Sequence, residues 1–485
     1  MPFPKFSIVI PTVDRHQLLE KTIAACLLCR YPNLEVLVSD NFSAPDTARV
    51  VERFSADSRV RYVRTARRLS MPDHWEFAWH QSTGDYIIIN GDDDAFLTDL
   101  VDRLADIAAT FNAALMSWDA GLYFHPDWDL SGRNTFVFMN RHSRLLFDIN
   151  PQALFASYAC LEIPLCFPQG TRICFSRNLA NRAVSRTGRV FWPPYPDYSA
   201  PLLLLGLLED KRYIYWDALA GYGGRSRDSN AAAWDKEQGK TGNARRARDY
   251  FDELQQQDIY PHSKLKIKAY CNGHAETLNL LRRLLPDVFG PHDVDPVALI
   301  AAVECELRGI GMHNPFLGPH ERVAFDIFLR SEDPGIVEEA MKIVRQRKTL
   351  ATLETWRSNR WRFSWHLLSV LARPEFLFRS ILKLMRYFIG SLTRAQSNPP
   401  ASADAGGARM ASVKHHDAKT WLECSSLGAE NGLDLIRRFD DVVKAFDRRD
   451  SRNLAAFHDK KLLVAAYETN GRLASGPGTE APSRS

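Results

Sequence analysis

Short apolar runs alternate with helical patterns from Phe6 to Trp118 of this 485-residue chain. Runs such as Phe6 to Ile10 and Tyr86 to Ile89 have few polar positions, which is typical of strands buried on both faces of a sheet. Between the runs, apolar residues recur near helical spacing, as they do from His16 to Cys29. This alternation predicts the α/β fold class, with a mostly parallel sheet and flanking helices.

Composition divides the chain into five expected regions. The α/β domain is expected over 1–240 and a helical C-terminal region begins after it, with a helical domain over 241–352. A basic segment follows over 353–395, a linker rich in Pro, Ala and Gly over 396–412, and a helical piece with a disordered tail over 413–485.

Charge and cysteine content limit the class of protein. A formal net charge of +4 is too small to imply a nucleic-acid partner. The eight cysteines are scattered, which favours reduced, buried thiols and a cytoplasmic protein. The N-terminus lacks signal-peptide anatomy, and no uncharged apolar run reaches the roughly 18 residues that span a bilayer.

Polar residues follow three of the expected strands directly. Ligands of open α/β sheets gather at the carboxyl ends of the strands, so we expect these residues to share one edge. They are Thr12, Asp14 and Arg15 after the first strand, which Pro11 ends, Asp40 and Asn41 after the second, and Asp92, Asp93 and Asp94 after the Tyr86 strand.

The three consecutive aspartates indicate a cation site. In an extended backbone Asp92 and Asp94 would point the same way and could share one ion, while Asp93 would point elsewhere. Adjacent carboxylates repel one another unless a cation or hydrogen-bond donors offset the repulsion. Hard oxygen ligands on a short turn suit Mg²⁺ or Mn²⁺ with substrate phosphates. The alternative is a solvated acidic turn that caps the helix from about Leu97.

These motifs, in this order, carry a family resemblance. Ile10-Pro11-Thr12 with Arg15, Glu35 to Ser43 with Asp40 and Asp46, and Gly84-Asp85-Tyr86 leading to the three aspartates resemble bacterial family 2 glycosyltransferases of the GT-A fold. The stretch Leu69 to Ala78 is similar to the abequosyltransferase-like subgroup, where Asn more often stands in place of His74. The resemblance covers about residues 5 to 230.

The resemblance implies roles for these residues and the nature of the substrates. Thr12 and Arg15 would line the nucleotide site, Asp40 would accept a hydrogen bond from the base, and the aspartates would serve ribose and metal as a DXD motif. The expected cofactor is Mn²⁺ or Mg²⁺, and the expected donor is a nucleoside diphosphate sugar, with UDP favoured. The expected nucleotide-sugar-binding residues are Pro11, Thr12, Asp14, Arg15, Asp40, Asn41, Asp92 and Asp93, with Asp92 and Asp94 as metal ligands.

Two later motifs complete the expected site. In Phe191 to Tyr198 three prolines restrict the backbone and present Asp197 at a set place near the start of an apolar helix. The same family places its base in a similar context, so Asp197 is either the catalytic base of an inverting transfer, a helix cap, or both. The run Gly221 to Ser226 is either a loop that closes over the donor diphosphate or a surface loop.

The region from Trp356 to Arg394 combines basic residues with aromatic ones and an apolar stripe. Such a pattern suits a helix on an anionic membrane surface, and equally a helix pair docked on the catalytic domain. Taken together, the sequence predicts an inverting, metal-dependent transfer of a sugar to a lipid-linked or polysaccharide acceptor. A sugar-nucleotidyltransferase and a non-catalytic carbohydrate-binding or scaffold module are the alternatives.

Overall fold

The computed structural model describes most of the chain, and every structural statement below concerns these residues. They are 3–128, 134–139, 142, 144–227, 229, 260–310, 314, 317–358, 414–416, 419–423, 430–437 and 472–473. The basic segment and the linker expected over 353–412 lie outside them, except for residues 353–358.

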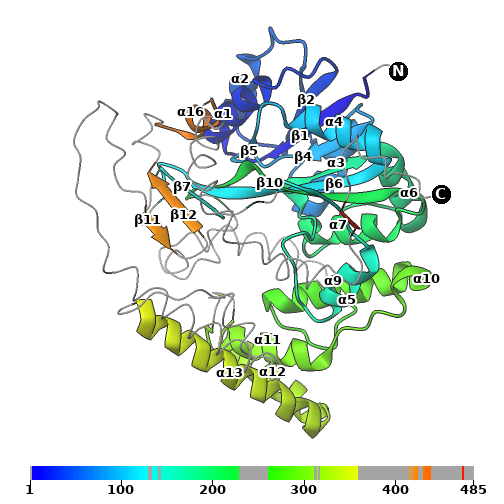
Figure 1. Ribbon diagram of the computed structural model, residues 1–485, viewed down its shortest axis with the longest axis vertical. Helices are drawn as coiled ribbons and strands as arrows, with labels where there is room; N and C mark the ends of the chain where they lie inside the picture. Colours follow the sequence, from blue (N-terminus) through cyan, green and yellow to red (C-terminus); the bar gives the residue numbers. More distant parts are fainter. Residues whose placement is uncertain are drawn as a thin grey trace, which may run out of the picture.

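The α/β part contains alternating strands and helices in the predicted order (Figure 1). Its elements are β1 (Phe6–Thr12), α1 (His16–Leu27), β2 (Leu34–Asp40), α2 (Pro45–Glu52), β3 (Val60–Arg64), α3 (Met71–Gln81), β4 (Tyr86–Ile89), β5 (Ala95–Phe96), α4 (Leu100–Phe111), β6 (Ala113–Phe124), β7 (Thr135–Met139), β8 (Leu146–Asp148), α5 (Pro151–Ala159), the 3₁₀ turn η1 (Gly170–Arg172), β9 (Ile173–Ser176), α6 (Arg177–Thr187), α7 (Pro196–Gly206) and β10 (Arg212–Arg225).

The sheet is mostly parallel in its strand directions. β1 lies between β2 and β4, so that Ile8 pairs with Val36 on one side and Ile88 on the other, all in parallel register. β3 extends the sheet beyond β2, and β10 runs parallel to β6. β9 is antiparallel between β4 and β6. The predicted fold class is confirmed.

Helices cover both faces of the sheet, which explains the continuous apolar runs. In β1, Ile8 and Ile10 belong to the core under α1 and α4, whereas Val9 belongs to the core under α3 and α7. All three side chains are fully buried. A strand buried on both faces needs apolar residues at successive positions.

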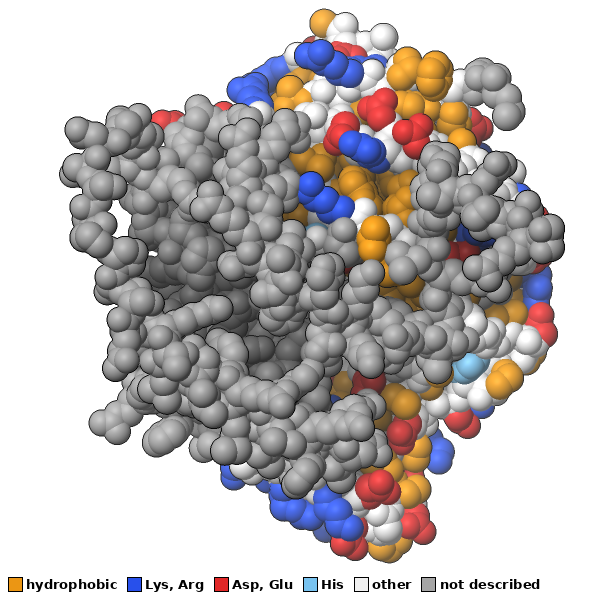
Figure 2. Space-filling model, in the orientation of Figure 1, with side chains coloured by type: hydrophobic (Ala, Val, Ile, Leu, Met, Phe, Trp, Pro, Cys, Tyr) orange, Lys and Arg blue, Asp and Glu red, His pale blue; other side chains and the backbone are white. Residues whose placement is uncertain are grey.

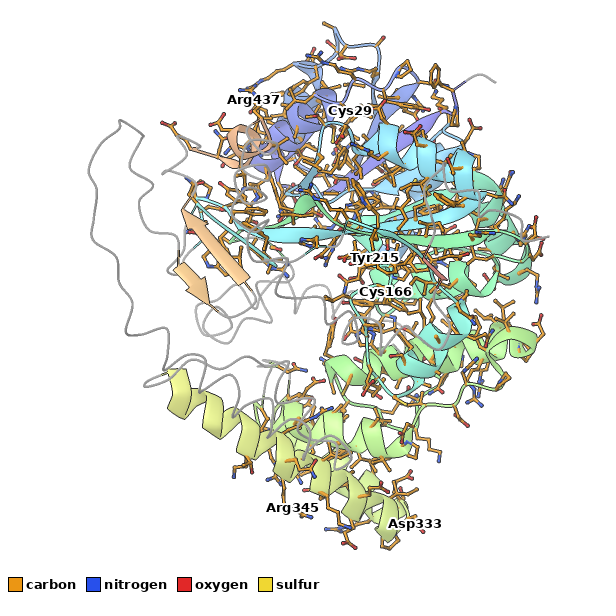
Figure 3. All side chains as sticks on the ribbon, viewed as in Figure 1. Cys29, Cys166, Tyr215, Asp333, Arg345 and Arg437 are labelled. Carbon is orange, nitrogen blue, oxygen red and sulfur yellow. The ribbon has the colours of Figure 1, made fainter. Side chains whose placement is uncertain are left out.

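The helical region follows as α9 (Tyr270–Leu284), α10 (Pro286–Phe289), α11 (Pro296–Leu307), α12 (Pro319–Ser331) and α13 (Pro334–Ser358). Its own core includes Ile300, Phe325, Ala340 and Val344. Leu278, Leu281 and Leu285, at the start of this region, belong instead to the core of the α/β part. Asp333 and Arg345, labelled in Figure 3, mark the end of the region far from the sheet. No helix among the described residues has the length and apolarity needed to cross a bilayer.

The described part of 413–485 differs from the expected helical piece. It contains β11 (Lys414–His416), β12 (Lys419–Glu423), α16 (Gly432–Arg437) and β13 (Arg472–Leu473). β12 extends the sheet by pairing with β7, and α16 lies beside α1, where Arg437 is labelled in Figure 3. Leu435 and Ile436 are buried against Ala95 and Tyr222. Pairing with the sheet edge, rather than local helical pattern, determines the strands here.

One face of the molecule is shown in Figure 2, where hydrophobic side chains gather at the middle and Lys and Arg side chains gather at the lower end. The lower end is formed by α13, whose exposed basic side chains include Lys342, Arg345, Arg347 and Lys348.

Candidate active site

The three aspartates lie in a buried turn between β4 and β5. Asp92, Asp93 and Asp94 are 4%, 7% and 8% exposed. The backbone N–H of Asp94 donates to the carbonyl of Gly91 at 3.2 Å, which closes the turn. Because carboxylates are rarely buried without partners, this turn is not the solvated cap considered as an alternative. Helix α4 begins later, at Leu100.

Arg15 and Thr12 hold the first part of the turn. The Arg15 guanidinium forms ion pairs with both Asp92 and Asp93, and it donates to Ser226 Oγ at 2.9 Å. Thr12 Oγ1 donates to Asp92 Oδ2 at 2.7 Å. Although burial opposes its charge, the two carboxylates raise the pKa of Arg15. The ends of β1 and β4 are therefore joined by charge, as their position at one sheet edge predicts.

Asp94 has different partners. Its Oδ1 accepts a hydrogen bond from the Gly224 N–H at 2.8 Å, and its carboxyl is also hydrogen-bonded by the Thr171 side chain. Burial, together with the charge of Asp93, raises the pKa of Asp94 to about 6. A nearby positive charge would stabilise the ionised form of such a buried carboxyl.

The cation site predicted to be shared by Asp92 and Asp94 stays a prediction. The prediction assumed an extended backbone, but these residues belong to a turn, in which alternation of side chains does not apply. Among the described residues, no group of three His, Cys, Asp or Glu side chains is placed to hold a metal ion. Asp94 is the carboxylate whose surroundings favour a cation, whereas Asp92 is already paired with Arg15.

The Gly221 to Ser226 run is not a loop, which corrects both interpretations made from sequence. It forms the end of β10, where Gly221 and Tyr222 pair with Phe96 and Ala95 of β5. A Cβ at Gly224 would lie 2.1 Å from the Asp93 carbonyl oxygen. Glycine is required because the acidic turn approaches the strand this closely.

Asp14 connects the ends of β1 and β2. Its backbone N–H donates to Ser43 Oγ at 2.9 Å, and its Oδ1 accepts from the Ala44 N–H at 2.9 Å. Its φ of 53° lies in the left-handed region, which Asp tolerates better than most residues. Pro11, two residues before the turn, pairs with Ser39 inside the sheet. Asp14 thus shapes the loop in which the predicted nucleotide-binding residues lie.

The side chains of Asp40 and Asn41 form hydrogen bonds with other residues of the protein. Asp40 Oδ1 accepts from the Ser43 N–H at 2.9 Å and Oδ2 from the Tyr62 hydroxyl at 2.6 Å, and only 1% of the side chain is exposed. Asn41 exchanges two hydrogen bonds with the backbone of Leu69, at 2.8 and 2.9 Å. In this structure both residues order loops, and the predicted bond from Asp40 to a base stays a prediction.

His74, the departure from the subgroup pattern, is a buried structural residue. Its Nε2 lies 3.0 Å from Ser39 Oγ, and burial lowers its pKa to about 4. The ring is therefore neutral at physiological pH and supports the end of β2 from the α3 side.

Asp197 lies in the first turn of α7, close to the acidic turn. Tyr195 is the N-cap residue and Pro196 the first helical residue, so Asp197 does not occupy the cap position. A Cβ at Gly170 would lie 2.6 Å from the Asp197 Cα and Cβ atoms, so only glycine permits this contact. Burial raises the pKa of Asp197 to about 6.

The 3₁₀ turn η1 joins the two carboxylates. Gly170 contacts Asp197, and the next residue, Thr171, is hydrogen-bonded to Asp94. Arg172 follows, and its guanidinium is oriented by Asp119 Oδ1 at 3.4 Å. The turn therefore lies between Asp94 and Asp197, and Arg172 is its last residue.

Arg225 is a second cation beside the acidic turn. Burial lowers its pKa, against the attraction of Asp93 and Asp94, and its charge also interacts with that of Arg172. Among the described residues no hydrogen bond or ion pair is made by its guanidinium. Two arginines near buried carboxylates provide positive charge that an anionic ligand could use.

Sequence reasoning missed Thr171, Arg172 and Arg225 as members of this site. One signal was available, since Arg225 lies within the run from Gly221 to Ser226 that was considered for the donor diphosphate. Only the pairing of β10 with β5 brings Arg225 to the aspartates, and only the η1 contact brings Thr171 to Asp94.

A protein-family model and a known protein each match a part of this chain. Residues 7–161 match the model of the family described as Glycosyl transferase family 2. A 103-residue segment is 31% identical to a GalNAc(5)-diNAcBac-PP-undecaprenol beta-1,3-glucosyltransferase of Campylobacter jejuni subsp. jejuni serotype O:2. This segment is 21% of the present chain and spans only 33% of the length of that relative.

Solved structures of low identity also resemble the chain. A 1–349 fragment of S. aureus TarS in complex with UDP-GlcNAc is 12% identical, with 74% of this chain and 93% of that chain covered and a TM-score of 0.39. A mannosyltransferase from Pyrobaculum calidifontis in complex with GDP-Man and Mn²⁺ is 16% identical, with 71% and 87% covered and a TM-score of 0.33. Over its residues 7–161, this chain is similar to glycosyl transferase family 2.

Proposed function

We propose that this chain is an inverting, metal-dependent glycosyltransferase of cell-surface glycan synthesis. It would transfer a sugar from a nucleoside diphosphate donor to a hydroxyl group of a lipid-linked or polysaccharide acceptor. The observation that carries this proposal is the η1 turn, which contacts Asp197 through Gly170 and Asp94 through Thr171. A base for the acceptor and a carboxylate for the donor diphosphate thus lie on either side of one short turn.

The donor side comprises the ends of β1, β2 and β4. Thr12, Arg15 and Asp92 form one hydrogen-bonded group, and Asp14 shapes the loop next to it. In the proposal these residues hold the nucleoside, as the family resemblance implies. UDP is the favoured nucleotide, and the abequosyltransferase-like subgroup stays a prediction.

The residues present fit one divalent cation bound with a substrate diphosphate. Asp94 would hold the cation, because its buried carboxyl has a pKa raised to about 6 and a positive charge would lower that pKa. Mg²⁺ or Mn²⁺ commonly uses one or two carboxylates and takes its other ligands from water and phosphate. When bound, the cation would supply positive charge to the leaving diphosphate. Arg172 and Arg225 would supply further charge from the protein.

Asp197 is the proposed general base. Inversion requires a carboxylate that accepts the proton of the attacking hydroxyl while its oxygen bonds to the anomeric carbon and the diphosphate leaves from the opposite face. A pKa of about 6 leaves Asp197 mostly ionised at pH 7 and makes it a better proton acceptor than an ordinary Asp. In the proposal the second carboxylate, Asp94, holds the cation and does not attack, which is consistent with a single displacement.

The acceptor class and the membrane location extend the proposal. The Campylobacter relative is named for an undecaprenol-linked substrate, which supports a lipid-linked acceptor here. The basic segment over 353–395, proposed to contact an anionic membrane surface, lies outside the described residues apart from 353–358. The exposed basic side chains of α13, including Arg345 and Lys348, directly precede it. Near an anionic surface each such residue contributes about 1 kcal/mol.

A donor panel tests the proposed function. Purified full-length chain is incubated with UDP-, GDP-, CDP- and dTDP-sugars and Mn²⁺, and release of the nucleoside diphosphate is measured with and without EDTA. We expect slow, metal-dependent hydrolysis of one donor class. Release of pyrophosphate from a nucleoside triphosphate and a sugar phosphate would indicate the nucleotidyltransferase, and binding without turnover would indicate the non-catalytic module.

A further inference from the structure

Tyrosines from two regions of the chain meet beside Asp197. Tyr198 follows Asp197 in α7, and Tyr270 begins α9 of the helical region. The Tyr270 hydroxyl donates to the Tyr198 hydroxyl at 3.1 Å, and their rings are nearly perpendicular, with centroids 6.5 Å apart. Gln169, immediately before η1, donates to the same Tyr198 hydroxyl at 3.2 Å.

The start of α9 in the helical region packs closely against the start of α7, where Asp197 lies. A Cβ at Gly273 of α9 would lie 2.1 Å from the Tyr195 ring, the residue that caps α7. Glu306 of α11 accepts hydrogen bonds from the first two N–H groups of α9, those of Tyr270 and Cys271, both at 2.8 Å. The start of α9, and with it Tyr270, is therefore held at a defined position relative to Asp197.

The tyrosine cluster consists of Tyr158, Tyr198 and Tyr270 with His274, and it has a buried side, the back, and a partly exposed side, the front. Tyr158 and His274 lie at the back, with 0% and 3% exposed, and the Tyr158 hydroxyl is 2.8 Å from His274 Nδ1. Asp197, Tyr198 and Tyr270 are each partly exposed. The charge of Asp197 and burial both raise the pKa of Tyr198, so its phenol keeps its proton. A phenol that accepts two hydrogen bonds can still donate that proton to a ligand.

The position of the acceptor follows from the proposed base. A hydroxyl deprotonated by Asp197 must come within hydrogen-bond reach of its carboxyl. On the side of Asp197 that faces η1 lie Asp94 and the proposed site of the donor diphosphate. The acceptor must then lie near the two tyrosines, whose rings can cover an apolar sugar face while their hydroxyls bond to sugar hydroxyls.

We infer that Tyr198 and Tyr270 form an acceptor-binding wall beside Asp197. The acceptor places a sugar ring against this wall. Because Tyr270 belongs to the helical region, that region contributes directly to acceptor recognition. This inference rests on the proposed function, because the position of the acceptor is deduced from the role of Asp197. It assigns to Tyr270 a part in specificity that lies outside the family-matched residues 7–161.

Ligand-observed saturation-transfer NMR tests the wall without knowledge of the natural acceptor. The probes are p-nitrophenyl glycosides of glucose, galactose, N-acetylglucosamine and N-acetylgalactosamine, added to the full chain with UDP and Mn²⁺ present. We expect at least one glycoside to bind the wild type. Tyr270→Phe, which keeps the ring, should weaken binding roughly threefold to tenfold, the effect of one lost hydrogen bond. Tyr270→Ala should weaken it further.

Tyr158→Phe is the matched control, because it removes a phenol hydroxyl from the buried back of the same cluster. We expect its glycoside binding to stay within about twofold of wild type, and UDP binding to be equal in all variants. The inference is overturned if no glycoside binds the wild type, if Tyr270→Phe and Tyr270→Ala bind as well as wild type, or if Tyr158→Phe loses binding equally. Donor hydrolysis, measured in parallel on the wild type, reports separately on the proposed function.

Discussion

Replacing Asp197 by Asn should abolish transfer and at the same time stabilise the protein. Burial raises the pKa of this carboxyl from 3.8 to about 6. Because the folded state then binds this proton more tightly than the unfolded chain, the contribution of Asp197 to the free energy of unfolding falls as pH rises from about 4 to about 6. The full difference corresponds to about 3 kcal/mol. Since Asp197 is partly exposed to water, we expect a gain of about 1 to 2 kcal/mol for Asp197→Asn at pH 7.5.

The assay compares unfolding by urea at pH 4 and pH 7.5 with sugar transfer at pH 7.5. Asp197→Asn should show its gain in stability only at the higher pH, should lose transfer by about a hundredfold or more, and should keep donor affinity. Asp46→Asn is the matched control, because Pro45-Asp46 opens α2 as Pro196-Asp197 opens α7, but Asp46 is exposed and paired with Arg49 at 2.9 Å. We expect that control to be destabilised by about 0.3 to 1 kcal/mol and to remain active. Equal destabilisation of Asp197→Asn at both pH values, or loss of donor binding, would refute the reasoning.

Four further outcomes are expected. Asp94→Asn should lose most Mn²⁺-dependent turnover without losing stability at pH 7.5, because burial disfavours the charged form that the substitution removes; retained turnover with unchanged Mn²⁺ dependence would contradict its assignment. The transfer rate at saturating substrates should rise with pH with an apparent pKa near 6, so that a flat profile from pH 5 to 8 would exclude Asp197 as the ionising base. Leu435→Ala should lower the free energy of unfolding by about 2 to 5 kcal/mol, since the side chain is fully buried in α16, and an unchanged urea midpoint would mean that α16 is not docked. The full chain should sediment with phosphatidylglycerol vesicles in a salt-sensitive manner, and binding that survives deletion of 353–395 would assign that segment a role in packing.

The strands of the α/β part and the placement of polar residues after them could be predicted from the sequence. Continuous apolar runs such as Phe6 to Ile10 require burial on both faces, and parallel strands bring their carboxyl ends to one edge. Thr12, Arg15 and Asp92 do meet there. These inferences succeeded because periodicity and strand direction are local properties that do not depend on distant contacts.

Other features could not be predicted from local pattern. The glycines from Gly221 to Gly224 suggested a loop, but close approach of the Asp93 carbonyl to Gly224 makes them part of β10. The backbone from Asp92 to Asp94, expected to be extended, is a turn closed by a hydrogen bond from the Asp94 N–H to the Gly91 carbonyl. The strands of the 414–423 segment depend on pairing with β7, far away in the sequence.

By itself the sequence determined the α/β class, the acidic turn and the candidate carboxylate in the Pro196-Asp197 segment, because each is encoded in a few neighbouring residues. Only the tertiary structure decided what surrounds them. Thr171 reaches Asp94, Gly170 contacts Asp197, and Tyr270 of a separate helical region bonds to Tyr198. Burial and long-range contact, which set the pKa of both carboxyls to about 6, arise only when distant segments exclude water together.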